Sequence, residues 1–417
     1  MFYKQIIQNL LLFALVLTFF SCLPTEEEKQ NDRNLARAKE LVSSMDDASL
    51  AAQLLMVGIQ GRVQLSARSQ VQLHRFPVGA VMLFKYNLGA GPEAARKLAD
   101  ACVAEVLSSG LGIPPLVAAD AEGGLVHRFG NDATRLPAPS QFAMLTEDSR
   151  LETIEEAAYL SALELRELGL SLNLAPLAEV LTDKNEAFCR RSVPAGRQGD
   201  FVASAAGAFV RGMEKAGIVC VVKHFPGSGE GDPHTKSARI SASGKDLEAL
   251  IHPFRQVIQK IHPEAIMVSH AIVESIDPAL PGTLSAELVT GELKGRLGFK
   301  GMVLTDDLRM AAIASTGKSP AEAAVEAVAA GCDLVMTWPE DLEDVHAALL
   351  EGLRSGLLSR ARLEDAGRRI LMTKLRFDLV DINEDADVAK RVKPFSVETL
   401  KAYRKATKDY LYEKGFR

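Results

Sequence analysis

The residues best suited to chemistry lie in one stretch, residues 218–234, with the sequence IVCVVKHFPGSGEGDPH. It begins with the apolar, β-branched run 218–222, which predicts a buried strand. Lys223 and His224 end this run, and a loop rich in glycine and proline follows, carrying Asp232 and His234. Ligands of parallel α/β proteins bind beyond the carboxyl ends of the strands, so this stretch predicts a ligand site. The alternative is an ordinary polar loop that closes a strand.

The carboxylates of this chain favour glycosidic bond hydrolysis. Asp306 follows a second apolar run in the segment VLTDDLRM, where its side chain can point into the mouth of a sheet or barrel. A retaining glycosidase needs such a carboxylate as nucleophile and a proton donor for the leaving oxygen. Glu230 could supply the proton. Asp232 and His234 are the other candidate, because side chains two residues apart in an extended loop share a face, and a carboxylate orients a histidine as a proton shuttle.

Polar side chains also end other apolar runs. An ionisable group at such a position is a candidate site residue, with a structural ion pair as the alternative. Together these residues predict a site at one rim: Asp120 and Glu122 after the third run, Asn173 and Glu179 after the fourth, Ser269 and His270 after the sixth, Thr305, Asp306 and Asp307 after the seventh, and Thr337 and Trp338 after the eighth.

Eight short apolar runs alternate with amphipathic stretches, which predicts an α/β fold, a (β/α)8 TIM-type barrel with a single catalytic domain. A doubly wound open sheet is the alternative, although no phosphate-binding glycine motif follows the first run. After residue 380 the pattern changes, and residues 381–417 predict a short C-terminal helical appendage. The predicted strands are 54–59, 78–84, 116–119, 171–175, 218–222, 265–268, 301–304 and 333–336, and the predicted helices include 92–108, 151–168, 201–216, 247–261, 320–330 and 342–354.

The composition is that of a globular protein. The 417 residues are 47% hydrophobic and 24% charged, and the net charge of −6 with no basic block argues against a nucleic-acid partner. One tryptophan and six tyrosines argue against a long aromatic groove for sugar polymers. Cys102, Cys189, Cys220 and Cys332 are scattered without metal-ligand spacing, so we expect no disulfide framework and no zinc site. No motif of the chain predicts a cofactor, and we expect none.

The N-terminus resembles a bacterial lipoprotein signal. Lys4 precedes an apolar run at 10–20, and Ser21 and Cys22 follow directly. Residues 1–21 are therefore expected to be a signal peptide, and acyl chains on Cys22 would anchor an exported protein in the cell envelope. An ordinary secretory signal and an uncleaved anchor are the alternatives. Residues 22–35 predict a charged linker, and the catalytic domain is expected at 36–380.

The order and spacing of these motifs resemble family 3 of the glycoside hydrolases. Within that family the chain is most similar to bacterial β-N-acetylglucosaminidases of peptidoglycan recycling, over residues 46 to about 376. The motifs that carry the resemblance are Asp120-Ala-Glu-Gly-Gly, Arg191-Ser, Lys223-His-Phe-Pro-Gly, Asp232-Pro-His234 and Thr305-Asp-Asp-Leu-Arg-Met310, with Met267-Val-Ser-His270 and Pro281-Gly-Thr-Leu-Ser285 in the sixth unit.

The resemblance implies a role for each matching residue. Asp306 matches the nucleophile that forms a glycosyl–enzyme intermediate, and Asp232 with His234 matches the acid/base pair. The residues expected to bind the sugar are Asp120, Arg191, Lys223, His224 and His270. The family version is a single-domain barrel without a metal, so we expect a monomer that hydrolyses N-acetylglucosamine-containing muropeptide fragments.

Three departures from the family pattern keep other functions open. The family's Gly-His-Gly is Gly227-Ser228-Gly229 here, and its Arg-Ser-Phe ends in Val193. The loop to the acid/base pair is shorter and contains Pro233, which stiffens a segment whose motion would gate catalysis. The alternatives are a family 3 β-glycosidase of other specificity, transfer of the sugar to phosphate, or a catalytically impaired lipoprotein that binds cell-wall sugars.

Overall fold

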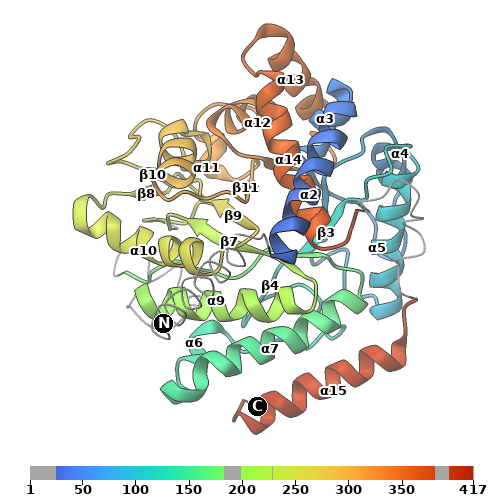
Figure 1. Ribbon diagram of the computed structural model, residues 1–417, viewed down its shortest axis with the longest axis vertical. Helices are drawn as coiled ribbons and strands as arrows, with labels where there is room; N and C mark the ends of the chain where they lie inside the picture. The colour runs from blue at the N-terminus through green and yellow to red at the C-terminus, as the bar shows by residue number, and fades with distance from the viewer. Residues whose placement is uncertain (1–24, 183–198, 228, 381–393, 417) are drawn as a thin grey trace, which may run out of the picture.

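The computed structural model describes residues 25–182, 199–227, 229–380 and 394–416 (Figure 1). Eight parallel strands close into a barrel in the order β1-β12-β11-β9-β7-β6-β3-β2, which confirms the barrel and excludes the open sheet. The strands are β1 Leu55–Gly58, β2 Ala80–Met82, β3 Leu116–Ala119, β6 Leu172–Asn173, β7 Val219–Phe225, β9 Ala265–Val268, β11 Met302–Asp307 and β12 Leu334–Thr337.

Helices surround the barrel because each apolar run is followed by an amphipathic stretch that covers the outside of the sheet (Figure 1). The six predicted helices are confirmed within a few residues at each end. The longer outer helices are α3 Asp47–Gln53, α4 Ala67–Arg75, α5 Pro92–Leu107, α7 Glu147–Glu167, α9 Gly199–Lys215, α10 Gly244–Lys260, the π-helix η2 Glu287–Arg296, α12 Pro320–Ala330, α13 Leu342–Ser355 and α14 Arg360–Arg376.

Short elements at the carboxyl ends of the strands shape the mouth. The strands β4 Ala121–Gly123 and β5 Val126–His127 form an antiparallel hairpin after β3. The strands β8 Arg239–Ile240 and β10 Ile272–Val273 pair in parallel beyond β7 and β9. The remaining short elements are α6 Pro139–Phe142, η1 Gly282–Leu284 and α11 Ala311–Ala314.

Residues 22–35 are predicted to be a linker, and this prediction is wrong from Glu26 onward. Helix α2, Glu26–Ser44, begins there, with a reciprocal capping box between Thr25 and Glu28. Its buried face, which includes Ala38 and Val42, packs against α14 (Figure 1). The high charge of this segment belongs to its solvent face, and the few apolar residues suffice for packing.

The C-terminal appendage is the helix α15, Val397–Glu413, which lies along α7 (Figure 1). Leu400 and Leu411 are buried, and the Thr407 hydroxyl donates a hydrogen bond to the Glu164 carboxylate of α7. None of the helices in the described ranges has the length and hydropathy needed to cross a membrane. Cys22 lies outside the described residues.

Candidate active site

The mouth of the barrel holds a cavity of about 430 Å³ that collects most of the predicted site residues. Its polar lining includes Asp120, Glu122, Arg128, Glu179, Lys223, His224, His234, His270, Asp306 and Asp307. Each strand of the barrel ends at this rim. Parallel pairing therefore brings together side chains that are far apart in the sequence, such as Asp120 and Asp307. Arg191 lies outside the described residues, and its predicted role stays a prediction.

Strand β7 supplies two consecutive side chains to the cavity. The apolar run 218–222 predicts that Lys223 and His224 lie beyond the end of the strand. The strand in fact continues to Phe225, so both residues lie inside it. Consecutive residues of a regular strand point to opposite faces. Here the register with β9 shifts between Val222 and Phe225, and this irregularity allows both Lys223 and His224 to line the cavity.

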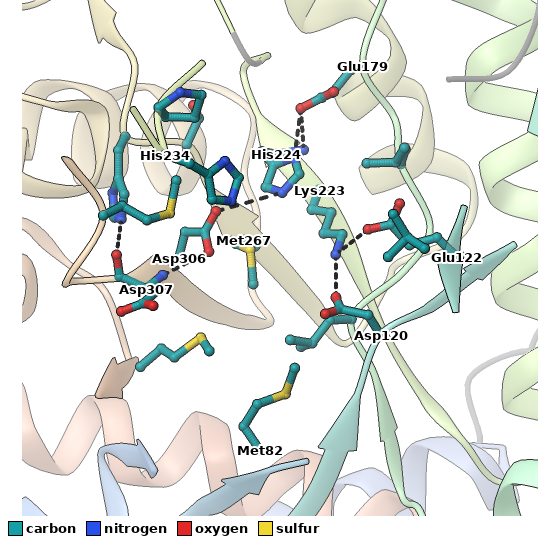
Figure 2. Close-up of a pocket in the computed structure, with 18 of the residues that line it drawn as sticks. Met82, Asp120, Glu122, Glu179, Lys223, His224, His234, Met267, Asp306 and Asp307 are labelled. Carbon is teal, nitrogen blue, oxygen red and sulfur yellow. Dashed lines mark hydrogen bonds and ion pairs between the residues drawn. The ribbon is translucent and has the colours of Figure 1, made fainter. Parts of the chain in front are cut away.

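Lys223 is buried between two carboxylates (Figure 2). Its Nζ lies 2.9 Å from Asp120 Oδ1 and 2.7 Å from Glu122 Oε1. Burial opposes its charge, but the two carboxylates raise the pKa of Lys223 above its ordinary value. Burial likewise favours the neutral acid at Asp120, yet Lys223 and Arg128 hold the pKa of Asp120 below its usual range. The cluster therefore presents fixed charges and hydrogen-bonding groups at the cavity wall.

His224 bridges a buried carboxylate and the predicted nucleophile (Figure 2). Its Nδ1 lies 2.7 Å from Glu179 Oε1, and its Nε2 lies 3.8 Å from Asp306 Oδ2. Burial alone would lower the pKa of His224, but Glu179 and then Asp306 raise it. Glu179 thus orients the ring and favours the imidazolium that faces Asp306.

Asp306 and Asp307 occupy different environments although they are adjacent in β11. Burial would raise the pKa of Asp306, but His224, His270 and the Asp307 backbone N–H lower it, which favours the ionised carboxylate. Burial raises the pKa of Asp307. Its carboxylate accepts hydrogen bonds from the Trp338 indole at 2.8 Å and from the Arg309 backbone N–H at 2.8 Å. The two carboxylates therefore differ: hydrogen bonds from Trp338 and Arg309 engage Asp307, whereas its charged neighbours favour the ionised form of Asp306.

The Asp232–His234 contact forms as expected. His234 Nδ1 lies 2.8 Å from Asp232 Oδ1, and the same oxygen accepts the His234 backbone N–H at 2.9 Å. The predicted geometry is wrong, however: the two residues meet in a tight turn, closed by Thr235 N–H to Asp232 O at 3.0 Å, and not along an extended segment. His234 lines the cavity together with Asp306 (Figure 2).

Backbone hydrogen bonds hold the loop that carries His234 on two sides, one of which is the segment that follows β11. The Ala312 backbone N–H in α11 donates to the Pro233 carbonyl at 3.1 Å, five residues after Asp307. On the other side the backbones of Glu230 and Arg239 exchange hydrogen bonds in both directions. Glu230, the alternative proton donor, does not line the cavity, and its carboxylate accepts from Ser241 at 2.5 Å.

His270 reaches the cavity wall from the turn after β9, but its ring nitrogens face protein atoms. Nε2 donates to the Asp307 backbone carbonyl at 3.0 Å, and Nδ1 lies 2.8 Å from the Thr283 hydroxyl. Burial lowers the pKa of His270, so the neutral ring is favoured. His270 therefore supports the backbone at the end of β11, next to Asp306.

Arg128 is a site residue that the sequence pattern does not single out. The β4–β5 hairpin turns at Gly123 and Gly124, both of which have positive φ. The turn brings Arg128 back to Asp120, and Arg128 Nη2 lies 3.1 Å from Asp120 Oδ2. Asn173 holds the hairpin by exchanging hydrogen bonds with the Ala121 backbone at 3.0 and 3.1 Å. In the sequence, the pair Gly123-Gly124 is the feature that could have predicted this hairpin.

Comparison with known proteins decides the family. The model described as "Glycosyl hydrolase family 3 N terminal domain" matches residues 49–373, the whole barrel. The chain belongs to glycosyl hydrolase family 3. Proteins similar to it include the beta-hexosaminidase of Alkalilimnicola ehrlichii, 36% identical over 289 residues, which are 68% of this chain and 79% of the relative. That of Tolumonas auensis is 32% identical over 310 residues, 74% of this chain and 88% of the relative.

Solved family 3 structures share the architecture. The glycoside hydrolase family 3 beta-N-acetylglucosaminidase from Paenibacillus sp. strain FPU-7 superposes with a TM-score of 0.77 at 28% identity, covering 88% of this chain and 69% of that chain. The beta-N-acetylhexosaminidase from Beutenbergia cavernae superposes with a TM-score of 0.70 at 29% identity, covering 79% of this chain and 98% of that chain. This family 3 protein is therefore a glycoside hydrolase. In the described part of the chain, no group of His, Cys, Asp and Glu side chains is arranged to hold a metal ion.

Proposed function

We propose that the protein is a retaining, exo-acting β-N-acetylglucosaminidase that removes terminal N-acetylglucosamine from peptidoglycan fragments. The observation that carries this proposal is one cavity lined by both an ionised Asp306 and the His234 of a hydrogen-bonded Asp–His pair. The beta-hexosaminidase relatives and the Paenibacillus beta-N-acetylglucosaminidase support the sugar.

In the first step, an Asp306 carboxylate oxygen bonds to the anomeric carbon while the bond from that carbon to the leaving oxygen breaks. His234 gives its Nε2 proton to the leaving oxygen. In the second step, the same nitrogen takes a proton from water, the water oxygen bonds to the anomeric carbon, and Asp306 leaves as a carboxylate. Asp120, Lys223 and His224 would hydrogen-bond the sugar hydroxyls from the opposite wall.

We also propose that Cys22 carries acyl chains and anchors the exported protein in the cell envelope as a monomer. The support is the sequence alone, a charged start and an apolar run directly before Ser21 and Cys22. A location outside the inner membrane would suit the recovery of wall fragments where they are released.

The test uses purified protein without residues 1–22. An aryl β-N-acetylglucosaminide and an aryl β-glucoside are supplied side by side, with and without phosphate. The proposal expects cleavage of the aminosugar glycoside alone, with free N-acetylglucosamine as product. Cleavage of the glucoside alone would transfer the assignment to another specificity, and a sugar phosphate product would indicate a phosphorylase. Inactivity on both by folded protein would leave sugar binding as the function.

A further inference from the structure

A buried carboxylate on α7 connects the C-terminal helix α15 to a loop beside the catalytic cavity. Glu164 is fully buried. One of its oxygens accepts a hydrogen bond from the Thr407 hydroxyl of α15, and the other accepts the Thr134 backbone N–H at 2.7 Å. Burial raises the pKa of Glu164, and the bonds from Thr407 and Thr134 oppose that rise. A buried carboxylate is costly unless its oxygens are bonded, so Glu164 holds together the two segments that satisfy it.

The loop that Glu164 holds is the support loop, residues 129–138, which runs from β5 to α6 without regular secondary structure. Such a loop has no helix or sheet hydrogen bonds to fix it, so its position depends on individual contacts. The side chains of Phe129 and Leu136 are buried in the core and fix two points of the loop. The bond from the Thr134 N–H to α7 fixes a third point between them.

The support loop lies directly against the tip of the β4–β5 hairpin. The Leu136 carbonyl accepts the Gly124 backbone N–H at 2.9 Å, and a Cβ on Gly124 would lie 2.8 Å from the Ala138 Cβ. Backbones this close leave no room between the loop and the tip, so a shift of the loop moves the hairpin. The hairpin places Glu122 and Arg128 in the lining of the catalytic cavity. The position of this cavity wall therefore depends on the support loop.

Helix α15 is attached at three points along its length as it follows α7 (Figure 1). At its start, the Glu167 carboxylate of α7 accepts the Ser396 backbone N–H at 2.7 Å. In its middle, Thr407 makes the bond to α7 described above. Beyond its end, the Phe416 ring packs against Phe142 of α6, with centroids 5.1 Å apart. Because α6 directly follows the support loop, the second and third attachments both act on the region that supports the hairpin.

We infer that α15 positions the sugar-binding wall of the cavity, with Thr407 and Glu164 as positioning residues that hold the β4–β5 hairpin through the support loop. Helix α15 lies outside residues 49–373, the part of the chain that the family model matches, so this support comes from an element added to the barrel. The inference rests on the proposed binding of the sugar by Asp120, which the hairpin residue Arg128 contacts. It assigns to the C-terminal appendage an effect on substrate affinity without contact to the substrate.

The test removes the Thr407 hydroxyl and keeps the shape of the side chain. Thr407→Val should raise KM for an aryl β-N-acetylglucosaminide by about 2- to 10-fold, the effect of one buried hydrogen bond. Because no reacting group is altered, kcat should change by less than about 2-fold. Thr407→Ser keeps the hydroxyl and should restore the KM of the unchanged protein. Thr153→Val is the matched control and should keep KM, since it removes another buried hydroxyl of α7, one that donates to the Ser149 carbonyl at 2.7 Å.

Hydrogen exchange and a double variant complete the experiment. Thr407→Val should speed backbone amide exchange at residues 121–138 in substrate-free protein, whereas Thr153→Val should not. In Glu164→Met protein, where the connection is already cut, Thr407→Val should have no further effect on KM. An unchanged KM in Thr407→Val protein, or equal changes of KM and exchange in the two valine variants, would overturn the positioning role. Absence of turnover in the unchanged protein would overturn the proposed function instead, because the exchange comparison does not require turnover.

Discussion

Asp306 and Asp307 are neighbours in β11, yet their surroundings give them different roles. The pKa of Asp306 is lowered by His224, which faces it, and by the nearby His270, whereas burial raises the pKa of Asp307, whose oxygens accept hydrogen bonds from Trp338 and Arg309. A nucleophile must be ionised, and of the two residues Asp306 is the one whose ionised form is favoured, which supports the proposal that Asp306 is the nucleophile. Asp307 instead fixes the indole ring of Trp338 by accepting its hydrogen bond.

Asparagine substitutions of the two aspartates should separate these roles. Asp306→Asn should lower kcat by about 10⁴-fold or more and leave the thermal midpoint nearly unchanged, because it removes the attacking carboxylate. Asp307→Asn should keep most of the turnover and cost about 1–2 kcal/mol of unfolding free energy through its weakened hydrogen bonds. Steady-state kinetics and urea unfolding of both variants provide the check. The reverse pattern would exchange the assignments.

His234→Ala should act through the leaving group. An alkyl leaving group needs the proton, so its rate should fall by about 10²- to 10⁴-fold. A dinitrophenyl leaving group departs without protonation and should be affected much less at the glycosylation step. The slope of log(kcat/KM) against leaving-group pKa measures this dependence. An unchanged slope in the variant would remove His234 from the acid role.

Glu179→Gln should move the pH profile. Glu179 raises the pKa of His224, so His224 keeps its charge to higher pH, and that charge in turn helps to keep Asp306 ionised at lower pH. Without the Glu179 carboxylate the imidazolium is lost at lower pH, the pKa of Asp306 rises, and the acidic limb of kcat/KM moves to higher pH. If kcat/KM decreased equally at every pH and its acidic limb did not move, Glu179 would have a packing role only.

At the scale of elements, strand positions follow from the sequence because each buried parallel strand is an apolar run. The runs 116–119 and 265–268 match β3 and β9 residue for residue. The extension of β7 to Phe225 does not follow, since Lys223 and His224 are polar and lie in the strand only because carboxylates from neighbouring units satisfy them. Pairings such as Glu179 with His224 depend on tertiary packing and have no local signal.

The β4–β5 hairpin tests how an element positions the site. Gly123 has φ +92, and a Cβ there would lie 2.4 Å from the Pro137 carbonyl oxygen. Gly123→Ala should therefore cost more than the roughly 1–3 kcal/mol of backbone strain alone, and it should displace Asp120, Glu122 and Arg128. Gly112→Ala is the matched control, because Gly112 has φ +74 with open space around it. Equal losses of unfolding free energy and activity in the two variants would contradict this view of the hairpin.

At the scale of the whole molecule, barrel closure brings the first and last strands together. β1 pairs with β12, Leu55 opposite Val335, and the helix α2 that precedes β1 packs on α14, which follows β12. The alternating pattern along the chain was enough to predict a barrel. The membership of α2 in the domain was not predictable, because its solvent face dominates its composition and only packing reveals its apolar face.

The proposed anchor concerns the chain as a whole. Expressed with its N-terminus intact, the protein should partition into detergent and incorporate labelled palmitate, and Cys22→Ser should abolish the labelling. Labelling that persists in the variant, or unchanged protein that stays in the aqueous phase, would contradict lipidation at Cys22. Activity on the aryl aminosugar glycoside should be the same for both forms, since the barrel does not depend on the anchor.

The central claim is that Asp306 carries the sugar during turnover. Incubation with a slowly released 5-fluoro-N-acetylglucosaminyl substrate, followed by proteolysis and mass spectrometry, measures it directly. The account predicts a sugar adduct on Asp306 that is absent from the Asp306→Asn protein. An adduct on a different residue, or no adduct together with a product of inverted anomeric configuration, would contradict it.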